Sequence, residues 1–163
     1  MRTTTINLYS INELSPEAQE KAIKEWREND DLPLLEEYMN DRLQAKLEQH
    51  KIEGDAQIRY SLSHCQGDGV SFTGTFEYKG QTYEVKVTDH HYQHAYTCSI
   101  TDFSETESEA LEADFKEVYL EICRQLEKEG YNYIEDMQSD ETIKETLLIN
   151  EYEYTENGDF WKY

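Results

Sequence analysis

The chain has 163 residues, 36 of them acidic and 15 basic, and a formal net charge of -21 at pH 7. This length suits one domain, and two prolines and seven glycines leave no linker, so we expect a single domain over residues 1–163. A field of this sign repels phosphate backbones and anionic lipid alike, which argues against direct binding to nucleic acid or a membrane.

The first quarter of the chain predicts a strand and two helices. Residues 3–9 are rich in β-formers and predict a short strand. Ser15 is a good N-cap and Pro16 suits the first helical position, so a helix is expected through about Glu28. Asp31 is expected to open a second helix, in which apolar side chains recur every four residues up to Leu47.

The middle of the chain has the period of two that is typical of strands. Residues 57–62 alternate apolar and polar side chains, and residues 70–78 and 81–88 predict a hairpin around Lys79 and Gly80. Residues 95–100 predict a fourth strand. Short connections between these segments indicate an antiparallel sheet.

The last third of the chain predicts helices and a hairpin. A long amphipathic helix is expected to begin at residues 104–107 and to end at Gly130, and Ser139 is expected to cap a shorter one. Asn157 and Gly158 predict a two-residue turn that pairs Tyr154 with Trp161. The fold class is therefore α+β, with an antiparallel sheet of about four strands plus a C-terminal hairpin, packed with three to four helices.

Three segments match motifs of one family: ELSPEAQEKAI at residues 13–23, YSLSHCQGDGVSF at residues 60–72 and YTENG at residues 154–158. The chain resembles a widespread group of small phage and prophage proteins. That group opens with an ELS-E-A-K/Q-KAI helix, carries an S-QGDG-F sheet segment and often ends in an F/Y-x-E-N/D-G hairpin. The family has no agreed activity, so the resemblance implies a mobile-element origin. Relatives vary at the positions of His64 and Cys65, so it implies no catalytic role for either residue.

Two segments could bind a ligand. The glycines around Gln66 and Asp68 let a backbone approach closely, although the same loop also fits a tight turn in which Asp68 bonds its own backbone. In an extended segment His90 and His94 would lie about 13 Å apart, too far for one zinc ion, and His91 would face the other way. We therefore expect polar loop histidines and no metal or cofactor.

Recognised catalytic motifs are absent: the sequence has no G-x-S-x-G, H-E-x-x-H or Walker loop, so we do not expect an enzyme. Cys65, Cys98 and Cys123 are odd in number and lack close paired spacing, which favours reduced structural thiols. The sequence has no apolar run of membrane-spanning length and does not open with a signal segment, so we expect a protein of the host cytoplasm.

Five acidic residues of the long helix are the candidate binding site. Spread over thirteen residues, or about 18 Å of helix axis, they give one charge per roughly 4 Å, near the 3.4 Å spacing of phosphates along a DNA strand. Such a face could imitate a nucleic-acid backbone, or it could be an ordinary solvated helix face. The five are Glu109, Glu112, Asp114, Glu117 and Glu121.

The resemblance implies a phage or mobile-element accessory protein, and the acidic charge predicts that it binds and inhibits a basic, nucleic-acid-handling host protein, as an anti-CRISPR or anti-restriction inhibitor does. The expected partner is a basic protein surface, such as that of a nuclease, and the oligomeric state is left open. One alternative is an antitoxin or regulatory partner of a toxin. Another is a metal-binding or enzymatic module that uses residues 90–94.

Overall fold

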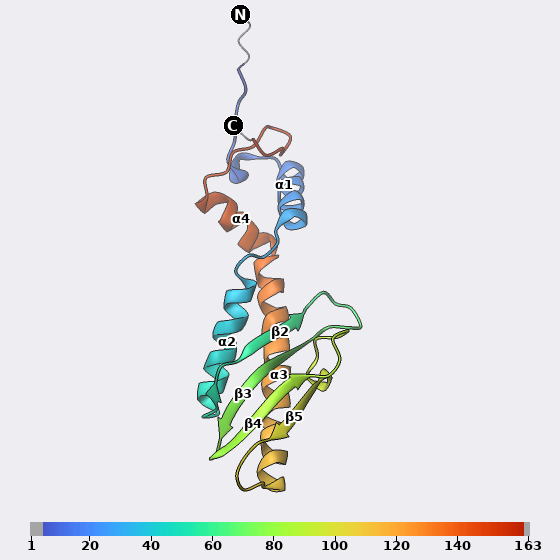
Figure 1. Cartoon of the computed structure of the whole chain (residues 1–163). Coiled ribbons are helices and arrows are strands. Elements are labelled where there is room, and N and C mark those ends of the chain that lie inside the picture. Colours follow the sequence, from blue (N-terminus) through green and yellow to red (C-terminus); the bar gives the residue numbers. More distant parts are fainter. Residues whose placement is uncertain (1–4, 162–163) are drawn as a thin grey trace, which may run out of the picture. The chain divides into compact units, whose positions relative to one another are not determined.

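A computed structural model describes residues 5–161, which form four helices and a five-stranded antiparallel sheet (Figure 1). The expected α+β class is confirmed. The chain divides into two compact units: Leu34–Tyr133, here the central unit, and Met1–Pro33 with Ile134–Tyr163, here the terminal unit. The number of domains stays a prediction.

The sheet belongs to the central unit and is built around its longest strand, β3 (Gly69–Tyr78). β3 pairs with β4 (Gln81–Val87), which in turn pairs with β5 (Cys98–Asp102). Its other edge pairs with β1 (Glu53–Gly54) and then with β2 (Gln57–Ser61). The predicted hairpin and the strand at residues 57–62 are confirmed. The expected fourth strand is half right, because residues 95–97 form a 3-10 turn before β5 begins, and β1 was not predicted.

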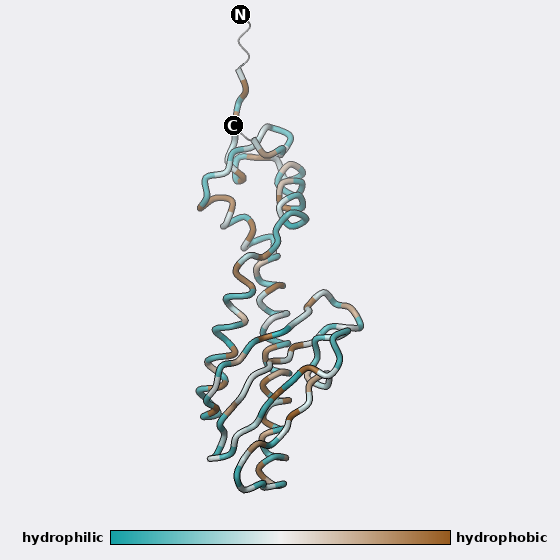
Figure 2. The backbone as a smooth tube through the Cα atoms, in the orientation of Figure 1, coloured by the Kyte–Doolittle hydropathy of each residue, from teal (hydrophilic) through white to brown (hydrophobic). Residues whose placement is uncertain are grey.

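Two helices supply the rest of the central core: α2 (Leu35–Gln49) and α3 (Glu109–Met137). Hydropathy alternates along the strands (Figure 2), so that one face of the sheet is apolar and packs against these helices. α2 begins four residues later than expected and α3 two residues later than the expected start at 104–107. The largest fully buried side chains of this core are Met39, Leu43, Phe72, Phe76, Tyr83, Phe115, Tyr119, Ile122 and Leu126.

A buried hydroxyl joins α3 to β3. Tyr119 is only 1% exposed, and its Oη donates to the carbonyl oxygen of Phe72 at 2.9 Å and accepts from the Phe72 amide at 3.2 Å. Phe72 lies two residues beyond Gly74–Val85, the last pair of the β3–β4 ladder. The Tyr119 hydroxyl therefore bonds one buried backbone donor and one buried backbone acceptor at the point where this ladder ends. Without these bonds, burying the two groups would cost free energy.

An ionic cluster joins α2 to α3. Glu129 of α3 accepts hydrogen bonds from Arg42 and Lys46 of α2, both at 2.7 Å. Lys46 is almost fully buried, and Gln125 is its second acceptor at 3.0 Å. The hydrogen bond from Arg42, helped by Lys46, holds the pKa of Glu129 below its usual range. A lysine can be buried here because a carboxylate oxygen and an amide oxygen accept hydrogen bonds from its ammonium group.

The prediction that Gly130 ends the long helix was wrong: α3 continues to Met137. Gly130 is buried, and a Cβ atom there would lie 2.4 Å from Cδ1 of Leu62 and 3.0 Å from Sδ of Met39. The glycine is therefore a place of close packing within the helix and not a terminator.

The terminal unit contains α1 (Pro16–Asn29) and α4 (Asp140–Ile149). Both predicted caps are confirmed, because Ser15 accepts from the Ala18 amide at 3.3 Å and Ser139 accepts from the Thr142 amide at 3.2 Å. The strand expected at residues 3–9 is reduced to one bridge between Tyr9 and Tyr154, and residues 1–4 lie outside the described part. The buried residues of this unit are Ile11, Leu14, Ala18, Ala22, Ile23, Ile143, Leu147 and Tyr154.

The predicted register of the C-terminal hairpin was wrong by one residue. Tyr154 pairs with Phe160 and not with Trp161, because the Thr155 amide bonds the carbonyl of Asp159 and closes a three-residue loop. A two-residue type I′ turn needs positive φ at both central residues, and here only Gly158 has it, at 81°. Tyr154 is consequently turned into the core, where it is 3% exposed. The expected two-residue turn would also pair Glu153 with residue 162 and Tyr152 with residue 163, and both of these partners lie outside the described residues.

Replacing Gly158 with alanine tests this packing. A Cβ there would lie 2.3 Å from the carbonyl oxygen of Ala18, and the φ of 81° already disfavours a side chain. We expect Gly158→Ala to lower the free energy of unfolding by about 3 kcal/mol in urea titrations followed by circular dichroism. The matched control is Gly80→Ala, whose φ is 77° but whose Cβ would meet nothing within 4 Å, and about 1 kcal/mol is expected there. Equal losses in the two variants would contradict the packing explanation.

Candidate functional site

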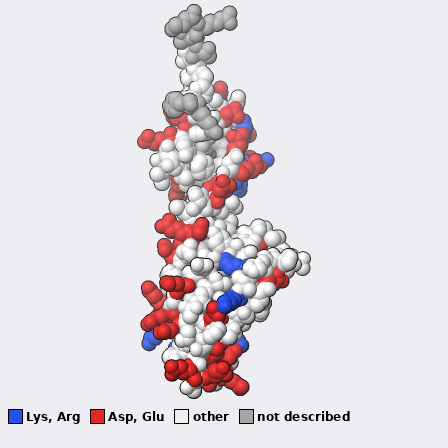
Figure 3. Space-filling model, viewed as in Figure 1, with Lys and Arg blue, Asp and Glu red and all other residues white. Residues whose placement is uncertain are grey.

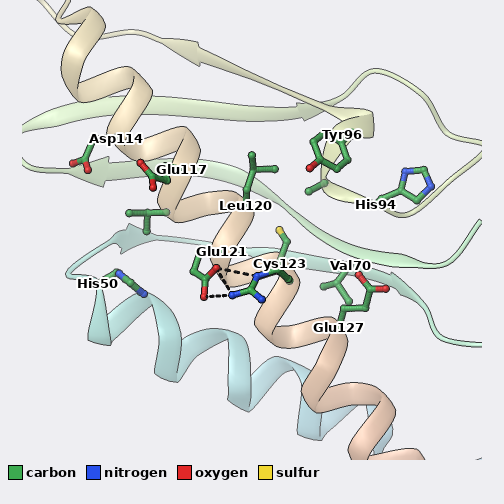
Figure 4. A pocket seen from close by; sticks show the side chains of 13 residues that line it. His50, Val70, His94, Tyr96, Asp114, Glu117, Leu120, Glu121, Cys123 and Glu127 are labelled. Carbon is green, nitrogen blue, oxygen red and sulfur yellow. Dashed lines mark hydrogen bonds and ion pairs between the residues drawn. The ribbon is translucent and has the colours of Figure 1, made fainter.

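A groove of about 660 Å³ follows the exposed side of α3 in the central unit (Figure 4). The helix supplies most of its wall, His50 at the end of α2 lies at one end, and residues 94–96 before β5 lie across from the helix. The residues that line the groove are His50, Val70, His94, Ala95, Tyr96, Asp114, Glu117, Val118, Leu120, Glu121, Cys123, Arg124 and Glu127.

Three of the five predicted binding residues line this groove, and two do not. Asp114, Glu117 and Glu121 lie along it, whereas Glu109 and Glu112 are absent from its lining. At 3.6 residues per turn, Glu112 and Asp114 project about 160° apart around the helix axis. The five carboxylates therefore do not form one continuous stripe.

Ion pairs neutralise part of the acidic surface. Asp114 accepts from Lys79 and from the hydroxyl of Tyr78, which lies 3.0 Å away, and these bonds hold its pKa below the usual range. Glu121 is bonded to Arg124 at 2.7 Å, which likewise lowers its pKa (Figure 4).

Outside the groove, Glu112 is paired with Lys116. In the described part of the chain, Glu117 and Glu127 form no ion pair of this kind. The four carboxylates and the one guanidinium of the lining give the groove a formal charge of -3, with histidines left out of the count.

Exposed apolar side chains accompany the carboxylates. Tyr96 is 83% exposed and Leu120 is 36% exposed, and both line the groove. Large apolar side chains beside charged ones are typical of protein contact surfaces. Tyr96, His50 and Glu127 were not predicted as site residues, and His94 was considered only as a candidate metal ligand. Tyr96, His94 and His50 reach this place only through the packing of α2 and of the segment before β5 beside α3.

Asp68, proposed above as a ligand residue, instead organises its own loop. Its carboxylate accepts from the Ser61 hydroxyl at 2.9 Å, from the Ser63 amide at 2.7 Å, from the Cys65 amide at 3.2 Å and from the Tyr131 hydroxyl. Burial opposes ionisation, but the bonds from Tyr131, Cys65 and Ser61 outweigh it and hold the pKa of Asp68 well below its usual range. These donors use the acceptor capacity that a ligand would need.

The neighbouring loop residues contribute little to a ligand site. Gln66 is exposed, and the ring of His64 stacks on Tyr131 with 4.5 Å between centroids. The geometry of this loop therefore favours a tight turn over a ligand site.

The histidine segment gives no support to a metal site. His91 bonds Asp89 at 2.8 Å, and His94 stacks on Tyr92. Within residues 5–161 no group of three or more histidine, cysteine or carboxylate side chains is placed to hold a metal ion. The three cysteines are free thiols, and burial raises the pKa of Cys123.

Comparison with protein-family models, with curated proteins and with solved structures finds no match for this chain. The resemblance to phage and prophage proteins stays a prediction. None of the helices in the described part of the chain has the length and apolar character that a membrane span requires.

Replacing Asp68 with asparagine tests its role in the loop. Because the pKa of Asp68 is lower in the folded state than in the unfolded one, its stabilisation is complete above about pH 5 and is lost as the pH falls below the ordinary carboxyl value. We expect Asp68→Asn to lower the melting temperature by about 5 °C at pH 7. The difference from the unmodified protein should narrow as the pH is lowered from about 5 to 2.

The control for this measurement is Asp41→Asn, an exposed carboxyl on α2, which should leave the melting temperature unchanged. If Asp68→Asn lowers the melting temperature by as much at pH 2 as at pH 7, the ionised carboxylate of Asp68 is not what stabilises the loop.

Proposed function

We propose that this protein is a phage or mobile-element accessory protein that binds and inhibits a basic, nucleic-acid-handling host protein. In this role it acts in the host cytoplasm as an anti-defence inhibitor of the anti-CRISPR or anti-restriction type. The acidic groove along α3 is the contact surface. The observation that carries the proposal is the combination, in one groove, of four carboxylates with the exposed side chains of Tyr96 and Leu120.

Charge complementarity supports this assignment. The formal net charge is -21, and most charged side chains on the face shown in Figure 3 are carboxylates. Proteins that handle nucleic acid expose lysine and arginine to bind phosphates, so an acidic protein is attracted to the same surface. Attraction of this kind accelerates association, but it does not by itself give a stable complex.

The exposed apolar residues supply what charge alone does not. Tyrosine is among the residues most often found as hot spots, which contribute most of the binding free energy of a protein interface. Tyr96 stands opposite Leu120 of α3 across the groove, so a partner that occupies the groove covers both side chains (Figure 4). Charge then brings the partner to the groove, and burial of Tyr96 holds it there.

The same charge predicts that the protein does not itself bind nucleic acid. Fifteen basic residues among 36 acidic ones do not form a dominant positive surface. In a gel-shift titration at physiological salt we expect no shift of a double-stranded DNA probe up to protein concentrations of about 10 µM. A complex that forms at micromolar protein would refute this expectation.

Reversing the groove carboxylates tests the contact surface. The variant carries Glu117→Lys, Glu121→Lys and Glu127→Lys, and its matched control carries Glu20→Lys, Glu145→Lys and Glu156→Lys at exposed positions of the terminal unit. Both variants change the formal charge from -21 to -15, since each substitution adds two units. Captured from a bacterial lysate, a basic nucleic-acid-binding protein should be retained by the unmodified protein and by the control, and lost by the groove variant.

Capture of the same protein by the groove variant would place the contact surface elsewhere. Competition then separates the inhibitor from the alternative antitoxin. An inhibitor that occupies a nucleic-acid channel is displaced by the partner's DNA or guide RNA, whereas an antitoxin that covers another site is not. Simultaneous binding of this protein and of nucleic acid to the partner would count against the proposed function.

A further inference from the structure

A second pocket lies wholly within the terminal unit and is lined mainly by aromatic rings. Its volume is about 490 Å³, and it lies between α1 and the segment that follows α4. Neither the α3 groove nor the proposed function involves it. The residues that give it its chemistry are Trp26, Tyr152, Tyr154, Phe160, Glu25 and Asp159.

Neighbouring rings of this pocket pack against one another at inclined angles. Trp26 and Tyr152 lie 5.5 Å apart between centroids at 44°, and Tyr152 and Phe160 lie 5.0 Å apart at 80°. Tyr154 and Phe160 lie 5.9 Å apart at 55°. Several aromatic rings around one hollow are the arrangement that attracts a cation through the negative potential of the ring faces, and tryptophan is the strongest of them.

Two carboxylates complete the pocket. Glu25 and Asp159 line it together with the rings, and Lys21, which is not part of the lining, forms ion pairs with both of them. One ammonium therefore faces two carboxylates, which leaves an excess of one negative charge at the aromatic hollow. An apolar guest would gain nothing from that excess, whereas an organic cation would gain from both the rings and the carboxylates.

We propose that this aromatic pocket binds an organic cation of the ammonium or guanidinium class. Such a group is either a free small molecule or the side chain of a lysine or arginine of another protein. The site is independent of the α3 groove because all its residues belong to the terminal unit.

Paired probes of equal shape test this site. Choline and 3,3-dimethylbutan-1-ol share size and outline, but only choline is charged, and the peptide Gly-Arg-Gly presents a guanidinium side chain. Titrations of the full-length protein are followed by NMR through the indole Nε1–H of Trp26. We expect a saturable shift with choline, with Gly-Arg-Gly or with both, and binding of the neutral alcohol at least tenfold weaker than that of the better cation.

The stronger of the two cations identifies the source: choline points to a free small molecule and the peptide to a protein side chain. Equal affinity for choline and the alcohol, with no binding of the peptide, would overturn the proposal, as would the absence of any saturable shift.

Substitutions assign the binding to this pocket. Trp26→Leu should weaken cation binding about tenfold, and Trp26→Phe should restore part of it, with the resonances of Tyr152 as the probe. Glu25→Gln changes an exposed side chain, so the fold is preserved, and it should weaken binding about threefold. Trp161→Phe lies outside the pocket lining and should leave the affinity unchanged. Unchanged affinity in both Trp26→Leu and Glu25→Gln would show that the cation binds elsewhere.

Discussion

The orientation of α3 about its own axis, which decides which of its side chains face the sheet, is the constraint on which the central unit depends. One side of this helix is fully buried against the sheet and carries Phe115, Tyr119, Ile122 and Leu126. The Tyr119 hydroxyl fixes that orientation further, because it bonds the backbone amide and carbonyl of Phe72 beyond the end of the β3–β4 ladder. Residues on the opposite side, including Glu117 and Leu120, are thereby directed to solvent, so the core decides which side chains form the groove.

For the proposed contact surface, the position of the carboxylates on α3 matters more than their number. Charges on both flanks of α3 are paired with nearby cations, as Asp114 is with Lys79 and Glu112 with Lys116. Glu117 and Glu127 form no such pair in the described part of the chain, and they line the groove together with Tyr96 and Leu120. This combination is the reason for proposing a contact surface here, since an acidic coat that serves only solubility needs no exposed apolar side chains.

The two units present related chemistry on unrelated elements. The groove of the central unit joins carboxylates of a helix to a tyrosine that precedes β5, and the pocket of the terminal unit joins Glu25 and Asp159 to a set of aromatic rings. Carboxylates next to aromatic faces suit the ammonium and guanidinium groups of basic ligands, since both interactions strengthen where water is partly excluded. In both proposed sites, local geometry adds selectivity to the excess of 21 negative charges.

Local signals in the sequence determined the elements whose formation is a local matter. The caps Ser15 and Ser139, the strand at residues 57–62 and the hairpin of β3 and β4 were all predicted, because capping bonds, side-chain periods and tight turns involve neighbours along the chain. Only tertiary structure decided that α3 passes through Gly130, since the reason is contact with Leu62 and Met39 from distant segments.

Packing likewise decided the hairpin register and the site. Gly158 lies too close to Ala18 to carry a side chain, and the loop that contains it has three residues where two were expected. Three groove carboxylates could be identified from helix spacing, but Tyr96 and His50 could not. Their place depends on how separate elements approach one another, and a pattern read along one segment does not contain that information.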